Sequence, residues 1–247
     1  MTRLILPISI QLWEATASVP IMQMIAKQAE NNISNTVEKT DLPGAIIEGE
    51  YQDERQDEYG EVYIYQQKYY SCGSCIGLDY DEVKSEYKQL ITQLIRRSAF
   101  LTIFGLFEHR MNGCLDVMIN RSGYRGDIKG GTLERTHKIL TDIIGGKDII
   151  DLDHLTVIRN IMAHNDGVAA GYNKIIHQEG KRTHSAKRLL RAMRRAEDEK
   201  SGISINHFDS VLMGDQFLTY AVGEINHYIN KLEAAVQAYD IGKACNT

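Results

Sequence analysis

One long stretch of helical periodicity constrains the fold of this chain more than any other feature. From about Asp81 to Asn120, apolar residues recur at steps of three, four or seven, which is the spacing of one face of an α-helix. The 247-residue chain contains only three prolines, so long helices can run without interruption. We therefore predict an all-α protein with a long core helix here. The apolar positions are Val83, Tyr87, Leu90, Leu94, Leu101, Phe104, Met111, Leu115 and Met118.

Further helices are expected on both sides of this segment, each bounded by residues that typically begin or end helices. They are the first forty residues up to the turn at 41–44, residues 133–144 before Gly145-Gly146, a helix from Asp151 or Asp153 to about Asn165, and a final helix from about Asp209. This pattern predicts an up-and-down helical bundle with an N-terminal extension. We place the extension at residues 1–78 and the bundle at residues 79–247.

Charge is distributed unevenly along the chain, whose net charge is −5. Residues 174–200 form a basic insertion before the last helix, with nine Lys and Arg against four acidic residues, so this segment carries +5 and the remainder −10. Residues 48–61 instead contain seven acidic residues and one Arg, and an aromatic, β-prone stretch follows from Val62 to Tyr70. We expect a loop there, with room for a short strand pair.

A short motif lies near the end of the helix that is expected to finish at Asn165. Its sequence is Arg159-Asn160-Ile161-Met162-Ala163-His164. An Arg followed by Asn, with a His five positions after the Arg, resembles the R-x(4–6)-H signature of the HEPN superfamily of helical ribonucleases. The resemblance covers the motif helix, the long helix before it and the final helix.

The resemblance to HEPN proteins implies a homodimer that cleaves RNA without a metal or a cofactor, leaving 2′,3′-cyclic phosphate and 5′-hydroxyl ends. In that family, two protomers bring their Arg and His residues together in one composite cleft. A polar or acidic residue from the preceding long helix commonly lies beside the pair, and Glu108 matches that position. The implied catalytic residues are Arg159, His164, Glu108 and Asn160. Bacterial members often act as toxins or phage-defence effectors, with an antitoxin or a phage protein as partner.

The residue types suit that chemistry. A His can take or give a proton near neutral pH, and an Arg stays charged and holds phosphate oxygens. Arg159 and His164 are about 140° apart on an ideal helix, so both can face one substrate only if the helix frays at its end. The Asn165-Asp166-Gly167 sequence predicts such an end, from which His164 could swing out.

Structural explanations compete with each of these assignments. Arg159 and His164 could simply complement the negative end of a helix dipole. Glu108 could pair with a neighbouring cation such as Arg110, or face water at a boundary position. The insertion could be a solvated basic helix that pairs with the acidic segment at residues 48–61. Otherwise it binds the RNA backbone, and the residues assigned to that role are Lys181, Arg182, Lys187, Arg188, Arg191, Arg194 and Arg195.

The four cysteines are too few for a disulfide scaffold, which favours the cytoplasm. Cys72-Gly73-Ser74-Cys75 offers two zinc ligands or a redox pair, but no second Cys pair or close His pair follows it. We therefore expect no metal, and we expect no membrane segment because the apolar runs are short. The alternatives to catalysis are a silent member that binds RNA, a nucleotide or a protein, and a helical interaction protein with divided charge.

Overall fold

The structure is a computed structural model that describes residues 9–244, and it is mostly helical with two small antiparallel sheets. Its residues group into two compact units. The hairpin unit comprises residues 28–96, and the helical unit comprises the described residues up to 27 and from 97 onward. The all-α prediction is therefore correct for most of the chain and wrong for the strands. The predicted division at residues 78 and 79 falls inside the hairpin unit and stays a prediction.

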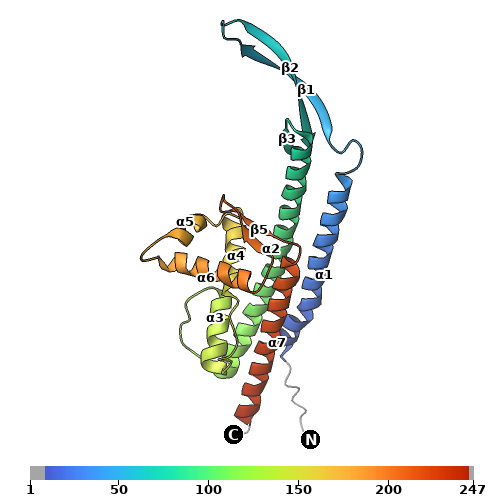
Figure 1. Cartoon of the computed structure of the whole chain (residues 1–247). Coiled ribbons are helices and arrows are strands. Elements are labelled where there is room, and N and C mark those ends of the chain that lie inside the picture. Colours follow the sequence, from blue (N-terminus) through green and yellow to red (C-terminus); the bar gives the residue numbers. More distant parts are fainter. Residues whose placement is uncertain (1–8, 245–247) are drawn as a thin grey trace. The chain divides into compact units, whose positions relative to one another are not determined.

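The hairpin unit contains the end of α1 (Ile10–Lys39), the strands β1 (Ile47–Gln56), β2 (Val62–Cys72) and β3 (Cys75–Gly77), and the start of α2 (Tyr80–Ser122) (Figure 1). At the base of the strands, Ile46, Cys72 and Val83 form a small buried core, with Tyr70, Cys75 and Tyr87 packed against it.

The acidic segment was expected to be a loop with room for a short strand pair. The structure contains the strand pair, which is longer than expected and includes most of the acidic residues. β1 and β2 pair antiparallel over ten residue pairs, from Ile47 with Ser71 to Gln56 with Val62. At the turn, Asp57 accepts hydrogen bonds from the backbone of Tyr59 and Glu61, each at 2.9 Å. Both faces of most of the hairpin are exposed, so acidic side chains on β1 are tolerated while the aromatic and β-branched residues of β2 favour the strand.

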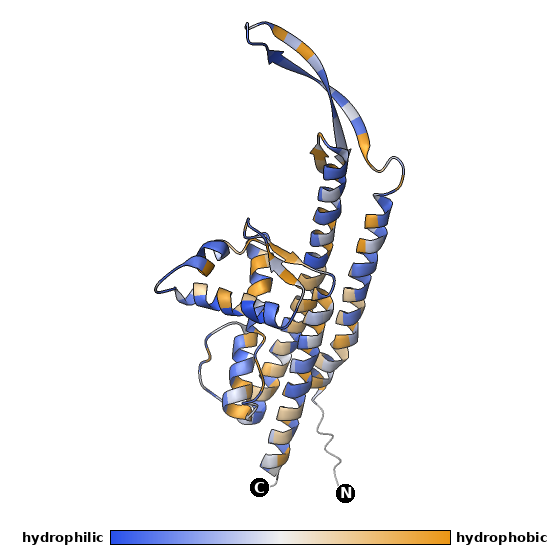
Figure 2. Cartoon of the chain, viewed as in Figure 1, coloured by the Kyte–Doolittle hydropathy of each residue, from blue (hydrophilic) through white to orange (hydrophobic). Residues whose placement is uncertain are grey.

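In the helical unit, contacts between side chains define the directions of the long helices. Glu14 on α1 pairs with Arg110 on α2 at 2.9 Å, and α1 runs antiparallel to α2. α7 (Phe217–Ala244) runs in the same direction as α2, because Phe217 packs on Phe100 near the start and Arg121 pairs with Asp240 near the end. Figure 2 shows apolar positions recurring along these helices between polar ones. The helices predicted before the turn at residues 41–44, at about residues 81–120 and at the end of the chain are confirmed. Residues 1–8 of the first of these predictions lie outside the described residues.

α4 (Asp153–His164) is the helix that carries the motif, and it runs antiparallel to α2. Arg159 pairs with Glu108, and beyond the helix Asp166 pairs with Arg97 at 2.5 Å. Before α4, α3 (Thr132–Ile139) continues into a π-helical turn over Leu140–Ile144 that ends at Gly145 with φ 103°. The predicted helices before Gly145 and before Asn165 are confirmed.

The segment between α4 and α7 contains the basic insertion. It forms α5 (Tyr172–His177), α6 (His184–Asp198), and a two-stranded sheet of β4 (Ile203–Ile205) and β5 (Val211–Met213).

The predicted start of the last helix at Asp209 is wrong, since α7 begins at Phe217. Asp209 has φ 61°, which places it in a turn between β4 and β5. Its carboxylate accepts hydrogen bonds from the backbone of Gly171 at 2.8 Å and of Asn173 at 2.9 Å. The aspartate therefore caps the start of α5, a different helix from the one that follows it in the sequence.

Candidate functional site

Arg159 lies at the centre of a bonded group that joins α4 to α2. Its guanidinium pairs with Glu108 and donates to the amide oxygen of Asn160 at 2.9 Å. The same guanidinium lies 5.5 Å from the ring centroid of Phe104. The side chain of Arg159 is 24% exposed and that of Glu108 is 31% exposed, so the pair reaches solvent without being free in it.

Glu108 therefore contacts the cation that the resemblance implied. The alternative partner, Arg110, pairs with Glu14 instead. The position of Glu108 on the apolar face of the long helix was the signal that predicted this contact. Three of the four residues assigned to catalysis are thus connected.

His164 is exposed and is the last residue of α4. The helix does not fray before it, because the backbone N–H groups of Asn165 and Gly167 both bond to the carbonyl of Ile161 at 3.1 Å. The expected fraying is therefore wrong: the carbonyl of Ile161 and the turn at Asp166, held by Arg97, stabilise the helix end. Within residues 9–244, no hydrogen bond or ion pair joins His164 to Arg159. The two side chains leave one helix about 140° apart.

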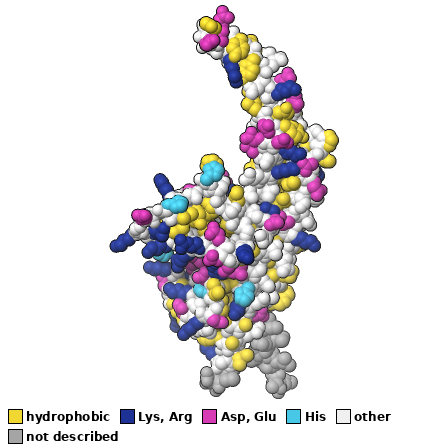
Figure 3. Space-filling view, viewed as in Figure 1, with side chains coloured by type: hydrophobic (Ala, Val, Ile, Leu, Met, Phe, Trp, Pro, Cys, Tyr) yellow, Lys and Arg dark blue, Asp and Glu magenta, His cyan; other side chains and the backbone are white. Residues whose placement is uncertain are grey.

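The seven cations assigned to RNA binding divide into two groups. Lys181, Lys187, Arg191 and Arg194 are exposed, and none of them forms an ion pair within the described residues. Together with His184, Arg182 and Leu190 they line a cavity of about 620 Å³. Figure 3 shows the resulting concentration of Lys and Arg side chains on the part of the molecule that contains α6.

The other three cations are engaged inside the helical unit. Arg182 donates to the backbone carbonyls of residues 175, 176 and 178 and so closes the end of α5. Arg188 pairs with Asp153 and with Glu134. Arg195 donates to Glu199 at 2.7 Å and to Glu224 at 3.0 Å. Arg182 thus stabilises the end of α5, while Arg188 and Arg195 attach α6 to neighbouring elements.

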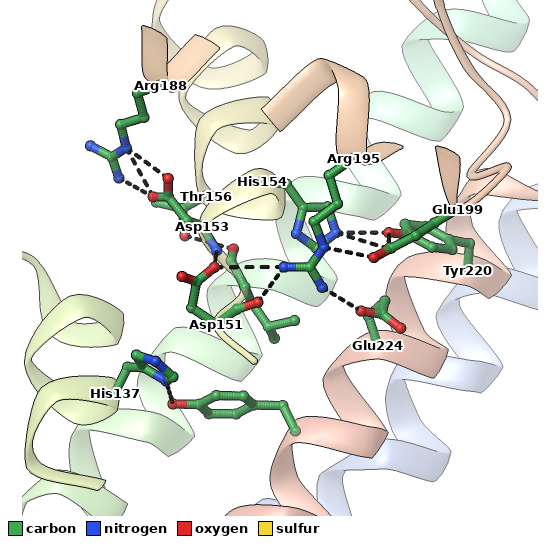
Figure 4. A network of polar contacts seen from close by, with 12 residues as sticks. His137, Asp151, Asp153, His154, Thr156, Arg188, Arg195, Glu199, Tyr220 and Glu224 are labelled. Atoms are coloured by element: carbon green, nitrogen blue, oxygen red, sulfur yellow. Dashed lines mark hydrogen bonds and ion pairs between the residues drawn. The ribbon is translucent and has the colours of Figure 1, made fainter. Parts of the chain in front are cut away.

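Figure 4 shows a polar network around His154 that the sequence did not reveal. His154 is buried on α4, and its Nε2 lies 2.8 Å from the hydroxyl of Tyr220 on α7. Tyr220 donates to Glu199, so His154 donates from Nε2, and its buried Nδ1 has no partner among the described residues. The residues of this polar network come from three separate helices or their ends, and no spacing in the sequence connects them.

The environment of the network shifts its titrations. Burial, followed by the charge of Arg195, lowers the pKa of His154 to about 4, so the imidazole is neutral near pH 7. Burial alone would raise the pKa of Glu199, but hydrogen bonds from Tyr220 and Arg195 lower it overall. Burial and the Glu199 carboxylate raise the pKa of Tyr220. The network is thus a fixed arrangement of a neutral His, a carboxylate and a guanidinium.

This cluster does not constitute a metal site. His154, Glu199 and Glu224 present ligand atoms within 4.8 Å of one another. However, the guanidinium of Arg195 bonds to both carboxylates, and Nε2 of His154 already bonds to Tyr220. A cation would have to displace Arg195 and leave its charge unpaired, which is costly. We assign the cluster a structural role.

Cys72 and Cys75 face each other across the β2–β3 turn as a register pair. Both are free thiols; Cys72 is buried, and burial together with the neighbouring Cys75 raises its pKa. A raised pKa disfavours the thiolate that binds zinc or attacks disulfides. Within residues 9–244, neither thiol belongs to a group of three or more potential metal ligands. The pair therefore fits the small core of the hairpin unit.

No model of a known protein family, no curated protein and no solved structure matches this chain. The HEPN resemblance therefore rests on the motif and its surroundings alone. α2 is long and apolar enough, by length and composition, to cross a membrane, a property that core helices of soluble proteins share.

Proposed function

We propose that this protein is a metal-independent endoribonuclease of HEPN type that acts as a homodimer. The observation that carries the proposal is the bonded group of Glu108, Arg159 and Asn160, which lies on α2 and α4 little more than one helical turn before the exposed His164. An ion pair to Glu108 and a hydrogen bond to Asn160 orient the guanidinium. An oriented, partly exposed cation is suited to hold a phosphate as negative charge develops on it.

The reaction that suits these residues is transfer of the phosphate to the neighbouring 2′-oxygen. A base takes the 2′-hydroxyl proton, the 2′-oxygen bonds to phosphorus, and the bond to the departing 5′-oxygen breaks as an acid gives it a proton. The products are a 2′,3′-cyclic phosphate and a 5′-hydroxyl. His164 of one protomer would be the base and His164 of the second protomer the acid, which also removes the need for Arg159 and His164 of one helix to face the same atom.

Three further proposals accompany this one and rest on the same resemblance. The helical unit is an up-and-down bundle of α1, α2, α4 and α7. The protein acts in the cytoplasm. Its biological role is that of a bacterial toxin or phage-defence effector, with an antitoxin or a phage protein as partner.

The test is incubation of the protein with mixed RNA in excess chelator, with mapping of the fragment ends. We expect cleavage by the unaltered protein and a loss of at least about 100-fold in Arg159→Ala and in His164→Ala. His177→Ala is the matched control, because His177 is likewise an exposed last residue of a helix, α5. Intact RNA, or equal loss in the control, would contradict the proposal.

The second candidate function is a catalytically silent protein that binds RNA, a nucleotide or a protein. Four cations that form no ion pair among the described residues line the cavity of about 620 Å³ beside α6. They favour this function, because they can bind phosphate whether or not His164 transfers protons. RNA binding that weakens steeply with salt, without any product, would identify this function. Binding that is insensitive to salt would indicate an apolar protein interface instead.

A further inference from the structure

Two sets of cations occupy different sides of α6: those that form no ion pair within residues 9–244, and those that pair with carboxylates. Lys187, Arg191 and Arg194 follow one another at steps of four and three, and the imidazole of His184 lies three positions before Lys187. This spacing places the four side chains on one face over about 15 Å. Arg188 and Arg195 are each one position farther on and turn toward Asp153 and Glu224. α6 therefore presents an outer row of cations whose positions are fixed by the anchoring of its inner side.

A second cavity lies on the other side of the start of α6. It has a volume of about 260 Å³ and lies between α4 and α6, with Asn160 and Asn165 on one side and Ser185 on the other. Ser185 and His184 are adjacent residues in the first turn of α6. His184 lines the cavity of about 620 Å³ described above, which we call the basic cavity. The first turn of α6 thus separates a polar cavity beside the motif from the basic cavity.

The first turn itself favours an anion. The hydroxyl of Thr183 accepts a hydrogen bond from the backbone N–H of Ala186 at 3.2 Å. Other N–H groups at the start of this 15-residue helix have no partner within the helix. The helix dipole adds partial positive charge at the same end. Polar cavity, helix start and basic cavity form a continuous series of groups that suit a chain of phosphates.

We propose that a single strand of RNA runs from the cavity at Asn160 across the first turn of α6 into the basic cavity. Lys187, Arg191 and Arg194 hold its backbone phosphates there, and an unstacked base contacts Leu190 and His184. A cavity with an apolar residue among cations suits an exposed base, and a base paired within a duplex cannot enter it. The identity of the ligand as RNA rests on the proposed function.

The test measures binding separately from cleavage. The probe is a fluorescently labelled oligouridylate of 12 nucleotides with 2′-O-methyl groups. It cannot be cleaved by attack of its 2′-oxygen, so fluorescence anisotropy reports binding alone. The test variant is Lys187→Gln/Arg191→Gln/Arg194→Gln. The control, Lys129→Gln/Lys138→Gln/Lys147→Gln, removes the same charge from exposed lysines of the helical unit that form no ion pair within the described residues.

Each lost phosphate contact lowers the salt dependence of single-strand binding by about 0.7 in log Kd per log salt. We therefore expect the slope to fall by about 2 in the α6 variant, and Kd to rise about 100-fold at roughly 0.1 M salt. The control should leave the slope unchanged. A 4-thiouridine in the strand should cross-link to residues 184–194 and to the Asn160 cavity.

Several results would overturn the proposal. Equal weakening in both triple variants would reduce the effect to net charge, and absence of binding by the folded unaltered protein would remove the site. Displacement of the oligonucleotide by polyglutamate at equal charge concentration would point to an acidic protein ligand. Binding without cleavage of ordinary RNA would contradict the ribonuclease and leave this site standing, whereas cleavage that survives the α6 variant would contradict the site alone.

Discussion

The β1–β2 hairpin and α6 are both dense in charge, but their charges have different consequences for the structure. Residues 47–72 contain seven acidic and two basic residues, and α6 contains five basic and two acidic ones. In the hairpin, Lys68 pairs with Glu48 while both side chains are half exposed or more. In α6, Arg195 bonds to two carboxylates with only 22% of its side chain exposed. Burial, and not charge density, thus decides how much stability is lost when one partner of an ion pair is removed.

The greatest change in stability is expected at His154, the buried member of the polar network. The pKa of His154 is lowered from 6.5 to about 4, so the unfolded chain binds a proton that the folded protein excludes. The contribution of His154 to the free energy of unfolding is therefore fully present above about pH 6.5. It is lost as the pH falls to about 4, and the loss is about 3 kcal/mol. Urea unfolding at a series of pH values measures this loss.

His154→Gln should flatten the dependence between pH 4 and 6.5, because glutamine does not titrate and can still donate to Tyr220. His137→Gln is the comparison: burial lowers the pKa of His137 too, but this residue is less buried and its effect should be smaller. An NMR titration that places the pKa of His154 near 6.5 would contradict the assignment.

The fold was predictable where helical periodicity is long. The pattern of residues 81–120 and the turn at 41–44 located α2 and the end of α1, because one buried face requires apolar residues at fixed steps. The hairpin was not predictable in the same way. Its exposed faces impose no alternation of apolar and polar residues on β1, and acidic residues there resemble those of a loop.

The candidate site, too, could be predicted from the sequence only in part. Contact between Glu108 and Arg159 was predictable because a carboxylate on an apolar stripe requires a partner, and the motif supplied one. The separate roles of Arg191 and Arg195 were not, since both have the spacing of one basic helix and only the positions of Glu199 and Glu224 distinguish them. Long-range partners of this kind leave no local pattern in the sequence.

Removal of the cation should cost more stability at the partly buried Arg195 than at the exposed Lys68. Arg195→Met leaves Glu199 and Glu224 close together without their cation, and should lower the free energy of unfolding by about 2 kcal/mol, less than for a fully buried pair. The charge of Arg195 also depresses the pKa of His154, so that pKa should rise in the variant. Lys68→Met is the matched change in the hairpin and should leave the free energy of unfolding unchanged within error. Equal losses in both variants would contradict the difference.

Shortening the outer part of the β1–β2 hairpin should leave the stability of the helices unchanged. Replacement of residues 53–65 by Asn-Gly joins Gln52 to Gln66, which are register partners, through a two-residue turn that suits a hairpin. No residue in the deleted segment is fully buried, so the variant loses no core contact. Urea unfolding followed by helical circular dichroism should therefore give the same midpoint as the full chain. A lowered midpoint would show that the outer hairpin stabilises the helices. It would contradict the claim that the exposed hairpin, unlike α6, contributes little to stability.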